Sequence, residues 1–218
     1  MKPLNKYFDH TNLKADATSA DIIKLCGEAK KYDFYAVCVH GCYVPLAAKE
    51  LADTGIKIAS VVGFPLGMES TESKVYEAVA ACKNGADEID MVINIGALKE
   101  GRYDYVRDEI EKVAEASGQH KAIVKVILEV CLLTDEEIVK GCQLAVEAGA
   151  AFVKTSTGFG KSGATPHTVA LIKETVGDQI MIKASGGIRD VLVTKEMLRL
   201  GADRIGASAS VVIMEAIK

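Results

Sequence analysis

The chain has 218 residues, of which 49% are hydrophobic and 26% are charged, and its formal net charge is -4. This length suits one substantial hydrophobic core, and no apolar run is long enough to cross a membrane. The basic residues are dispersed and Trp is absent, so the sequence shows neither a basic stripe nor a stacking surface for bases. A nucleic-acid partner and a membrane partner are therefore not expected.

The N-terminal segment, MKPLNKYFDHT, mixes charged and polar residues and lacks the apolar centre of a secretory signal. This predicts a cytoplasmic protein. Six cysteines lie mostly in apolar contexts, and a chain of this size does not need disulfides to hold together. Free thiols are therefore expected.

Short apolar segments alternate with longer amphipathic segments along almost the whole chain. The expected strands, in chain order, are residues 6–9, 36–39, 57–62, 88–92, 123–128, 152–154, 181–183 and 204–206. The expected helices are residues 19–32, 45–54, 71–84, 103–116, 135–148, 168–175, 193–200 and 211–217. Such alternation is typical of βα units with a parallel sheet. It predicts an α/β protein, a single-domain (β/α)8 TIM barrel over residues 1–218, with an open doubly wound sheet as the alternative.

Two lysines interrupt segments that otherwise have the pattern of buried strands. Lys154 precedes a glycine-rich loop, and Lys183 lies in a second segment of the same design, IMIKASGG. Burial lowers the pKa of a lysine, and a neighbouring ammonium lowers it further, so one of the pair becomes a plausible neutral amine that can attack a carbonyl carbon. A structural ion pair between each lysine and a carboxylate is the alternative.

Charged residues also interrupt two further strand segments. Asp90 lies between Ile89 and Met91, where a carboxylate could transfer protons during carbonyl chemistry or form a salt bridge with one of the lysines. Lys125 and Glu129 are expected to form a structural or positioning network inside the barrel.

The ends of the first and the last two expected strands supply candidate binding residues. Small residues follow the seventh and eighth strands, where barrels often bind phosphate through backbone N–H groups, and those residues include Gly186, Gly187, Gly206 and Ser208. Asp9 and Thr11 end the first strand and could order water or substrate hydroxyl groups. The neighbouring His10 has a structural packing role as its alternative.

Two further motifs do not carry a function. Gly160-Lys161-Ser162 has part of a phosphate-binding loop, but Thr155 stands where that motif requires glycine. Cys38, His40 and Cys42 have the residue types of a metal site but lack a second pair of ligands. No metal is expected.

The motifs taken together resemble the deoxyribose-phosphate aldolase family. The matching segments, in chain order, are FDHTNL, AVCV, VVGFPLG, GADEIDMVINIGAL, KVILE, FVKTSTGF, IKASGGIR and RIGAS. The resemblance implies a barrel enzyme that needs no metal or organic cofactor. It implies reversible cleavage of 2-deoxy-D-ribose 5-phosphate to D-glyceraldehyde 3-phosphate and acetaldehyde, in deoxyribonucleotide catabolism.

The resemblance also implies roles for individual residues. Lys154 matches the Schiff-base lysine of the family, Lys183 the second lysine that lowers its pKa, and Asp90 the proton-transferring aspartate. Gly158, Gly187 and Ser208 match positions that contact phosphate.

Two positions depart from the family pattern. Ala209 stands where many members have a second serine, and no tyrosine follows Tyr105, whereas many members end in a tail with a terminal tyrosine. Another Schiff-base aldolase or a transaldolase-like barrel acting on a different phosphosugar is one alternative. A sugar-phosphate-binding barrel without catalysis is another. Barrels of this family associate, so a homo-oligomer, either a dimer or a tetramer, is expected.

Overall fold

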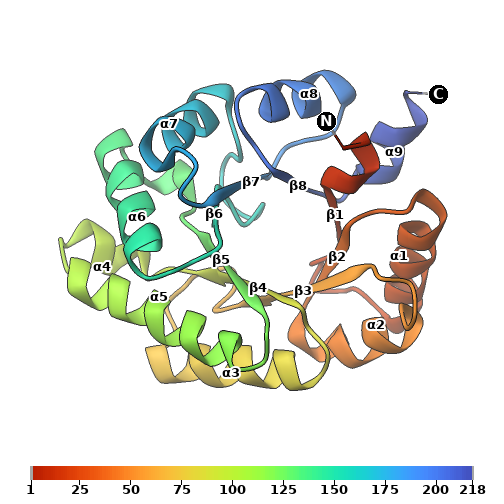
Figure 1. Cartoon of the computed structure of the whole chain (residues 1–218), viewed down its shortest axis with the longest axis horizontal. Helices are drawn as coiled ribbons and strands as arrows, with labels where there is room; N and C mark the ends of the chain where they lie inside the picture. Colours follow the sequence, from red (N-terminus) through yellow and green to blue (C-terminus); the bar gives the residue numbers. More distant parts are fainter. Residues whose placement is uncertain (1, 218) are drawn as a thin grey trace.

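Eight parallel strands form a closed barrel in the order β1 to β8, and helices surround it (Figure 1). The computed structural model describes residues 2–217. The strands are β1 Phe8–Thr11, β2 Ala36–Val39, β3 Lys57–Val62, β4 Glu88–Val92, β5 Ile123–Ile127, β6 Phe152–Lys154, β7 Met181–Ser185 and β8 Arg204–Ala207. Because β1 also pairs with β8, the sheet has no edge and the predicted (β/α)8 barrel is confirmed over the open sheet.

Most helices of the outer layer were expected from the sequence. They are α1 Ser19–Tyr32, α2 Val44–Glu50, α3 Thr71–Lys83, α4 Ile95–Lys99, α5 Tyr103–Gly118, α6 Asp135–Glu147, α7 Pro166–Val176, α8 Val191–Arg199 and α9 Ser210–Glu215. Three 3-10 segments, η1 Leu4–Tyr7, η2 Gly41–Tyr43 and η3 Val130–Leu132, add single turns. None of the helices within residues 2–217 is long and apolar enough to cross a membrane. All six cysteines are free thiols, as expected.

The first strand begins later than the sequence pattern predicts. Residues 6 and 7 belong to η1, and β1 extends instead to Thr11, which pairs with Cys38 of β2. Phe8 is fully buried and pairs with Ile205 of β8. The register with both neighbours, which a single segment cannot reveal, therefore sets the start of this strand.

The helices depart from the prediction most clearly at two places, while other helix ends differ by one or two residues. The helix expected over residues 45–54 ends at Glu50, and the Thr54 hydroxyl then closes a turn by donating to the Leu51 carbonyl and accepting from the Ile56 N–H. The short helix α4 was not predicted because five residues are too few to show a helical period. Its start is capped by the Asn94 side chain, which accepts from the Ala97 N–H.

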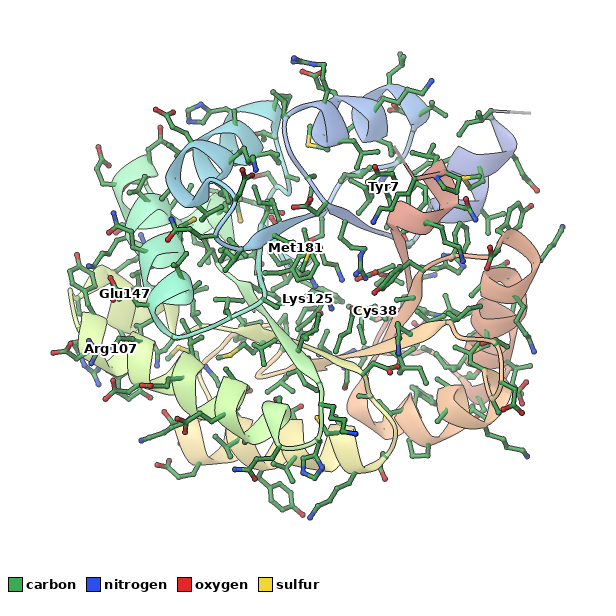
Figure 2. All side chains as sticks on the ribbon, in the orientation of Figure 1. Tyr7, Cys38, Arg107, Lys125, Glu147 and Met181 are labelled. Carbon is green, nitrogen blue, oxygen red and sulfur yellow. The ribbon has the colours of Figure 1, made fainter. Side chains whose placement is uncertain are left out.

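The inside of the barrel is unusual because much of it is charged. TIM barrels usually fill this space with branched apolar side chains. Here strand registers place Lys125 opposite Asp90 and Lys154 opposite Lys183. Figure 2 shows Lys125 and Cys38 within the ring of strands. The apolar core lies mainly between the strands and the helices, and a small apolar cluster of Leu13, Cys38, Ala59 and Val61 is separate from it.

Candidate active site

Lys154 is the strand lysine that reaches the cavity at the mouth of the barrel. It ends β6, only 3% of it is exposed, and its amine lies 2.8 Å from Asp90 Oδ2. Burial lowers its pKa, and the Lys183 ammonium lowers it further, so the net pKa lies below the usual value although Asp90 acts in the opposite direction. The structure thus gives this lysine the environment of a nucleophilic amine.

Lys183 occupies the matching position on β7 but is held in its charged form. Its amine lies 2.5 Å from Asp9 Oδ2 and 2.7 Å from Asp90 Oδ2. Burial alone would lower its pKa, but the two carboxylates outweigh burial and raise the pKa above its usual value. Lys183 is therefore a fixed positive charge beside Lys154, and it favours the neutral form of that neighbour.

Asp90 is the carboxylate shared by three lysines. Lys125 Nζ lies 2.7 Å from its Oδ1, while Lys154 and Lys183 approach its Oδ2. Burial would raise its pKa, but the three ammonium groups hold that pKa well below its usual range. Asp90 is fully buried and ionised, and it reaches the cavity only through Lys154.

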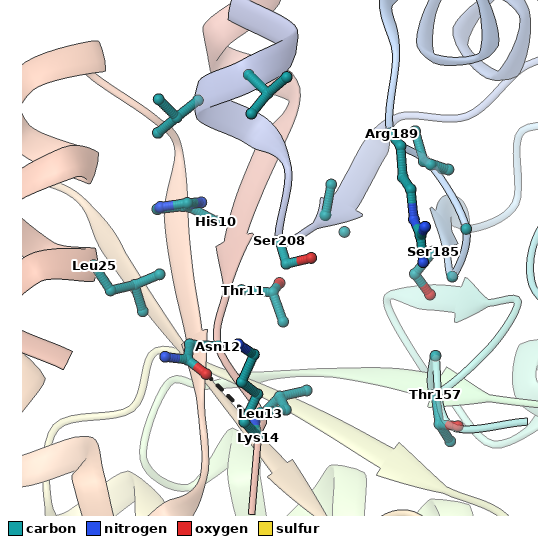
Figure 3. A pocket seen from close by; sticks show the side chains of 18 of the residues that line it. His10, Thr11, Asn12, Leu13, Lys14, Leu25, Thr157, Ser185, Arg189 and Ser208 are labelled. Carbon is teal, nitrogen blue, oxygen red and sulfur yellow. Dashed lines mark hydrogen bonds between the residues drawn. The ribbon is translucent and has the colours of Figure 1, made fainter. Parts of the chain in front are cut away.

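A cavity of about 590 Å3 opens above these residues. Its walls come from β1 and the loop after it, from α1 and α9, and from the loops after β6, β7 and β8. Figure 3 shows Thr11, Thr157, Ser185, Arg189 and Ser208 around it. The sequence-predicted binding residues that line it are Thr11, Gly158, Gly186, Gly187, Gly206 and Ser208. The structure therefore brings these positions together on the side of the barrel where Lys154 is accessible.

Asp9 was expected in the mouth of the barrel, and the structure places it elsewhere. It is fully buried, does not line the cavity and bonds to Lys183 and to Arg204. The expected contact with water or substrate hydroxyls is therefore corrected to an ion-pairing position inside the barrel. Thr11 does line the cavity, and its hydroxyl donates to the Asp9 carbonyl at 2.9 Å.

Close packing between two glycine loops, after β6 and after β7, shapes one side of the cavity. A Cβ added at Gly163 would lie 2.1 Å from the Gly186 carbonyl oxygen. The Ala164 N–H donates to the Ser185 carbonyl at 3.0 Å, which fixes the β6 loop against the β7 loop. Gly206 has a similar role toward Lys183, because a Cβ there would lie 2.9 Å from Lys183 Cε.

Glu129 holds the other side of the β6 loop. Its carboxylate accepts from the Thr157 hydroxyl and from the Thr157 N–H, and the Thr157 oxygen in turn accepts from the Phe159 N–H. Lys125, in contrast, pairs inside the barrel with Glu88 and Asp90. The two residues thus occupy separate networks, with Glu129 supporting a loop and Lys125 supporting the buried carboxylates.

Two further interior charges were missed by the sequence analysis. Arg204 at the start of β8 bonds to Asp9 at 2.7 Å and to Glu88 at 3.2 Å. Glu88 begins β4 two residues before Asp90, and side chains two apart on a strand share a face. That spacing could have placed Glu88 inside the barrel from the sequence.

The side chains of Cys38, His40 and Cys42 do not come together around a common centre. Cys38 is buried with its sulfur 3.9 Å from Asp90 Oδ2, whereas Cys42 is exposed and His40 bonds to the Leu13 carbonyl. Burial, followed by the charge of Asp90, raises the pKa of the Cys38 thiol. Within residues 2–217, no group of three or more His, Cys, Asp or Glu side chains has the geometry of a metal site.

Comparison with known proteins places this chain among relatives of nearly equal length. A protein named deoxyribose-phosphate aldolase from Finegoldia magna is 56% identical to it, over 97% of this chain and 99% of its own length. A protein of the same name from Aciduliprofundum boonei is also 56% identical, over 100% of this chain and 98% of its own length. The solved structure of a tetrameric deoxyribose phosphate aldolase from Aeropyrum pernix matches with a TM-score of 0.93 at 32% identity, over 98% of this chain and 90% of its own. The aldolase QR15 matches with a TM-score of 0.95 at 40% identity, over 100% and 96%. Residues 4–213 match the DeoC/LacD family of aldolases. The chain therefore belongs to the DeoC/LacD aldolase family and is a lyase.

Proposed function

We propose that this aldolase works through a Schiff base on Lys154 and cleaves 2-deoxy-D-ribose 5-phosphate to D-glyceraldehyde 3-phosphate and acetaldehyde. The observation that carries the proposal is the contrast between two lysines at one register position. Lys154 lines the cavity and has a lowered pKa, while Lys183 is buried behind it and stays charged. The substrate follows from the names of the relatives and from the resemblance of the sequence motifs to that family.

The proposed reaction begins when the Lys154 amine attacks the C1 carbonyl of the open-chain sugar. Loss of water gives a protonated imine, which draws electrons from the bond between C2 and C3. The C3 hydroxyl loses its proton as that bond breaks, and C3 becomes the carbonyl carbon of glyceraldehyde 3-phosphate. The remaining enamine takes a proton at C2, and water then releases acetaldehyde and the free amine.

Asp90 is proposed to assist these proton transfers through water. Its carboxylate lies 2.8 Å from the Lys154 amine, and a protonated imine keeps one N–H that can donate to it. Lys125 and Lys183 keep Asp90 ionised, so it has an oxygen that can take a proton from water in one step and return it in the next, although its lowered pKa makes it a weak base. Lys183 contributes a fixed positive charge that disfavours protonation of the free Lys154 amine.

The glycine loops of the cavity support the binding of a phosphate. Gly158, Gly186, Gly187, Gly206 and Ser208 all line it, and small residues let a phosphate approach backbone N–H groups closely. The Arg189 side chain lines the same cavity and adds a cation. Ala209 stands where many family members have a serine, so one side-chain hydroxyl is missing here and the proposed phosphate contacts are mostly backbone groups.

Borohydride trapping tests the proposed mechanism directly. The protein is incubated with acetaldehyde or deoxyribose 5-phosphate, reduced, digested and analysed by mass spectrometry. We expect a reduced adduct on the peptide that contains Lys154 and none in Lys154→Ala. Lys161→Ala, which removes an exposed lysine of the same loop, is the matched control and should be labelled like the unchanged protein. Absence of an adduct on Lys154 would refute the Schiff base.

Substrate preference is tested by comparing deoxyribose 5-phosphate with ribose 5-phosphate. Leu13 lines the cavity and packs in an apolar cluster with the buried residues Cys38, Ala59 and Val61, so this part of the wall offers a C2 hydroxyl few partners. An unpaired buried hydroxyl costs about 1–3 kcal/mol, so kcat/KM for the ribose compound should be roughly 5- to 150-fold lower. Equal values for the two sugars would favour an aldolase for another phosphosugar.

We further propose that the enzyme is a cytoplasmic homo-oligomer, a dimer or tetramer, that acts in deoxyribonucleotide catabolism. The tetrameric relative from Aeropyrum pernix supports the association. Light scattering coupled to size-exclusion chromatography tests it, and a monomer at micromolar concentration would contradict it.

A further inference from the structure

The buried charges inside the barrel form a closed ring in which cations and anions alternate. Its members, in order, are Arg204, Asp9, Lys183, Asp90, Lys125 and Glu88, which returns to Arg204. Neighbouring nitrogen and oxygen atoms are 2.5–3.2 Å apart. The ring therefore carries no net charge when every member is ionised.

Lys154 is attached to this ring as one additional cation. Among the described residues, its only carboxylate partner within ion-pair distance is Asp90, which already pairs with Lys125 and Lys183. A protonated Lys154 gives this buried assembly an uncompensated positive charge, and such a charge is costly where water is excluded. Loss of that one proton restores neutrality, and Lys154 lines the cavity through which the proton can leave.

We infer that Arg204 and Glu88 are positioning residues that set the ionisation of Lys154 through the charge of the ring. Neither lines the substrate cavity, and both are buried at the starts of their strands. The Arg204 guanidinium is held by Asp9 and by the ring of Tyr35, 3.6 Å from the ring centroid. The inference rests on the proposed role of Lys154 as the nucleophile.

The sign of each effect follows from charge balance. Without the Arg204 charge, the ring has a net charge of one negative unit, which favours the protonated form of Lys154. Without the Glu88 charge, the ring has one positive unit, which favours the neutral amine. Loss of both charges leaves the ring balanced again. If Arg204 and Glu88 only held the structure together, loss of either charge would loosen the network and change the ionisation of Lys154 in the same direction.

Other titratable and charged groups also surround the charge ring and Lys154, and they are the same in every variant of Arg204 and Glu88. They are Lys2 before the first strand, His10 in β1, Cys38 in β2, Glu129 after β5, and Tyr35 beside Arg204, together with the ring members Asp9, Asp90, Lys125 and Lys183. Because they are common to all variants, differences between variants report the altered charge.

The test measures how readily the Lys154 amine reacts at each pH. Acetaldehyde is trapped on Lys154 with cyanoborohydride between about pH 5 and pH 10, and the initial rate at Lys154 is followed by peptide mass spectrometry. A unit charge about 10 Å away at an effective dielectric constant of about 20 shifts a pKa by about one unit. We expect the midpoint to rise by about that much in Arg204→Gln, to fall in Glu88→Gln, and to return toward its original value in the double variant.

Control variants separate the effect of a lost charge from the effect of a disrupted structure. Arg199→Gln and Glu196→Gln make the same charge changes in an exposed pair on α8 and should leave the midpoint unchanged. Arg204→Lys keeps the charge and should also keep the midpoint. If Arg204→Gln fails to fold, as judged by circular dichroism, Glu88→Gln and Arg204→Lys carry the test with the same expectations.

The outcomes distinguish this inference from the proposed function. No adduct on Lys154 in the unchanged protein would overturn the proposed function itself. An adduct with the same midpoint in all folded variants, or shifts of the same sign in both single variants, would overturn the role of the ring while leaving the Schiff base in place.

Discussion

Lys154 and Lys183 pair in register on neighbouring strands, yet their environments shift their pKa values in opposite directions. The difference comes from carboxylates rather than from burial, because both side chains are buried. Lys183 has two close carboxylate partners, and Lys154 shares one with two other lysines. The pKa of Lys154 is therefore lowered because its one carboxylate partner, Asp90, already pairs with two other lysines.

The Lys183→Leu variant tests this residue-scale explanation. Without the Lys183 ammonium, Asp90 pairs more strongly with Lys154, so the pKa of Lys154 should rise and less free amine is present at neutral pH. Activity at pH 7 should fall by at least about tenfold, because a pKa rise of one unit reduces the free amine about tenfold. Part of the loss should be recovered at alkaline pH. An unchanged pH–rate profile would show that Lys183 does not tune Lys154.

The sequence could reveal some of these residues and not others. Lys154, Lys183 and Asp90 were recognisable because a charge interrupts an apolar strand segment. Arg204 and Glu88 were missed because charges at the first residue of a strand are usually solvent-exposed. The spacing from Asp90 was an available signal for Glu88, whereas only the closure of the barrel shows that Arg204 points inward. Asp9 was placed in the mouth because the sequence does not reveal how deep a strand residue lies.

At the scale of elements, the bounds of several strands were predictable and the ends of other elements were not. The bounds of β2, β3, β4 and β6 match the predicted residues because each is a short apolar run between polar turns. Helix α2 ended early because of a local turn around Thr54, which depends on a side-chain hydrogen bond rather than on hydrophobic period. Local polar contacts thus decide where regular structure stops.

Gly163→Ala tests the docking of the β6 loop on the β7 loop. The new methyl would overlap the Gly186 carbonyl, so the loop must move away from the cavity wall. We expect KM for deoxyribose 5-phosphate to rise severalfold, with a smaller effect on trapping of acetaldehyde, which has no phosphate. Gly27→Ala, on an exposed part of α1 with no atom within 4 Å of the added Cβ, is the control and should leave KM unchanged. Equal KM values in the two variants would contradict the docking argument.

A second buried ion pair links α3 to α5 outside the barrel. Lys74 donates to Glu109 at 2.7 Å and to the carbonyls of Gly67 and Val92, and both charged side chains are fully buried. The pair therefore anchors the loop after β3 to the end of β4. Its role is expected to be structural, because neither residue lines the cavity.

Lys74→Met should destabilise the protein by about 3–5 kcal/mol, because it leaves the Glu109 carboxylate buried without its cation. Urea unfolding measures the change. The double variant Lys74→Met/Glu109→Leu should recover part of the loss, since it removes both charges. A double variant less stable than Lys74→Met alone would contradict this account.

At the scale of the whole molecule, the interior carboxylates should make stability depend on pH. The cations that pair with Asp9 and Asp90 outweigh burial and hold both pKa values below the usual range. Their stabilising contribution is therefore present above the unfolded pKa of about 4 and is lost as the pH falls further. His10 adds an earlier loss below about pH 6.5, because burial lowers its pKa and the unfolded chain binds that proton more readily.

Urea midpoints measured from pH 8 to pH 3 test this expectation. They should decline modestly below about pH 6.5 and steeply below about pH 4, where the unfolded carboxylates begin to bind protons. His10→Gln should remove most of the first decline and leave the second. A midpoint that stays constant down to pH 3 would contradict the assigned ion pairs.

The ion pair between Arg204 and Asp9 has a consequence for the synthesis and folding of the enzyme. The two residues are 195 positions apart and lie on the strands whose pairing closes the barrel. During synthesis, Lys154 is made long before Arg204, so the chain contains the reactive lysine before it contains the charge pattern that governs it. A nascent or partly unfolded chain then carries only an ordinary protonated lysine, and reactivity toward cellular aldehydes appears when the last strand docks. Trapping of acetaldehyde during refolding should accordingly lag behind helix formation, and an adduct that appears with the first helices would contradict this order.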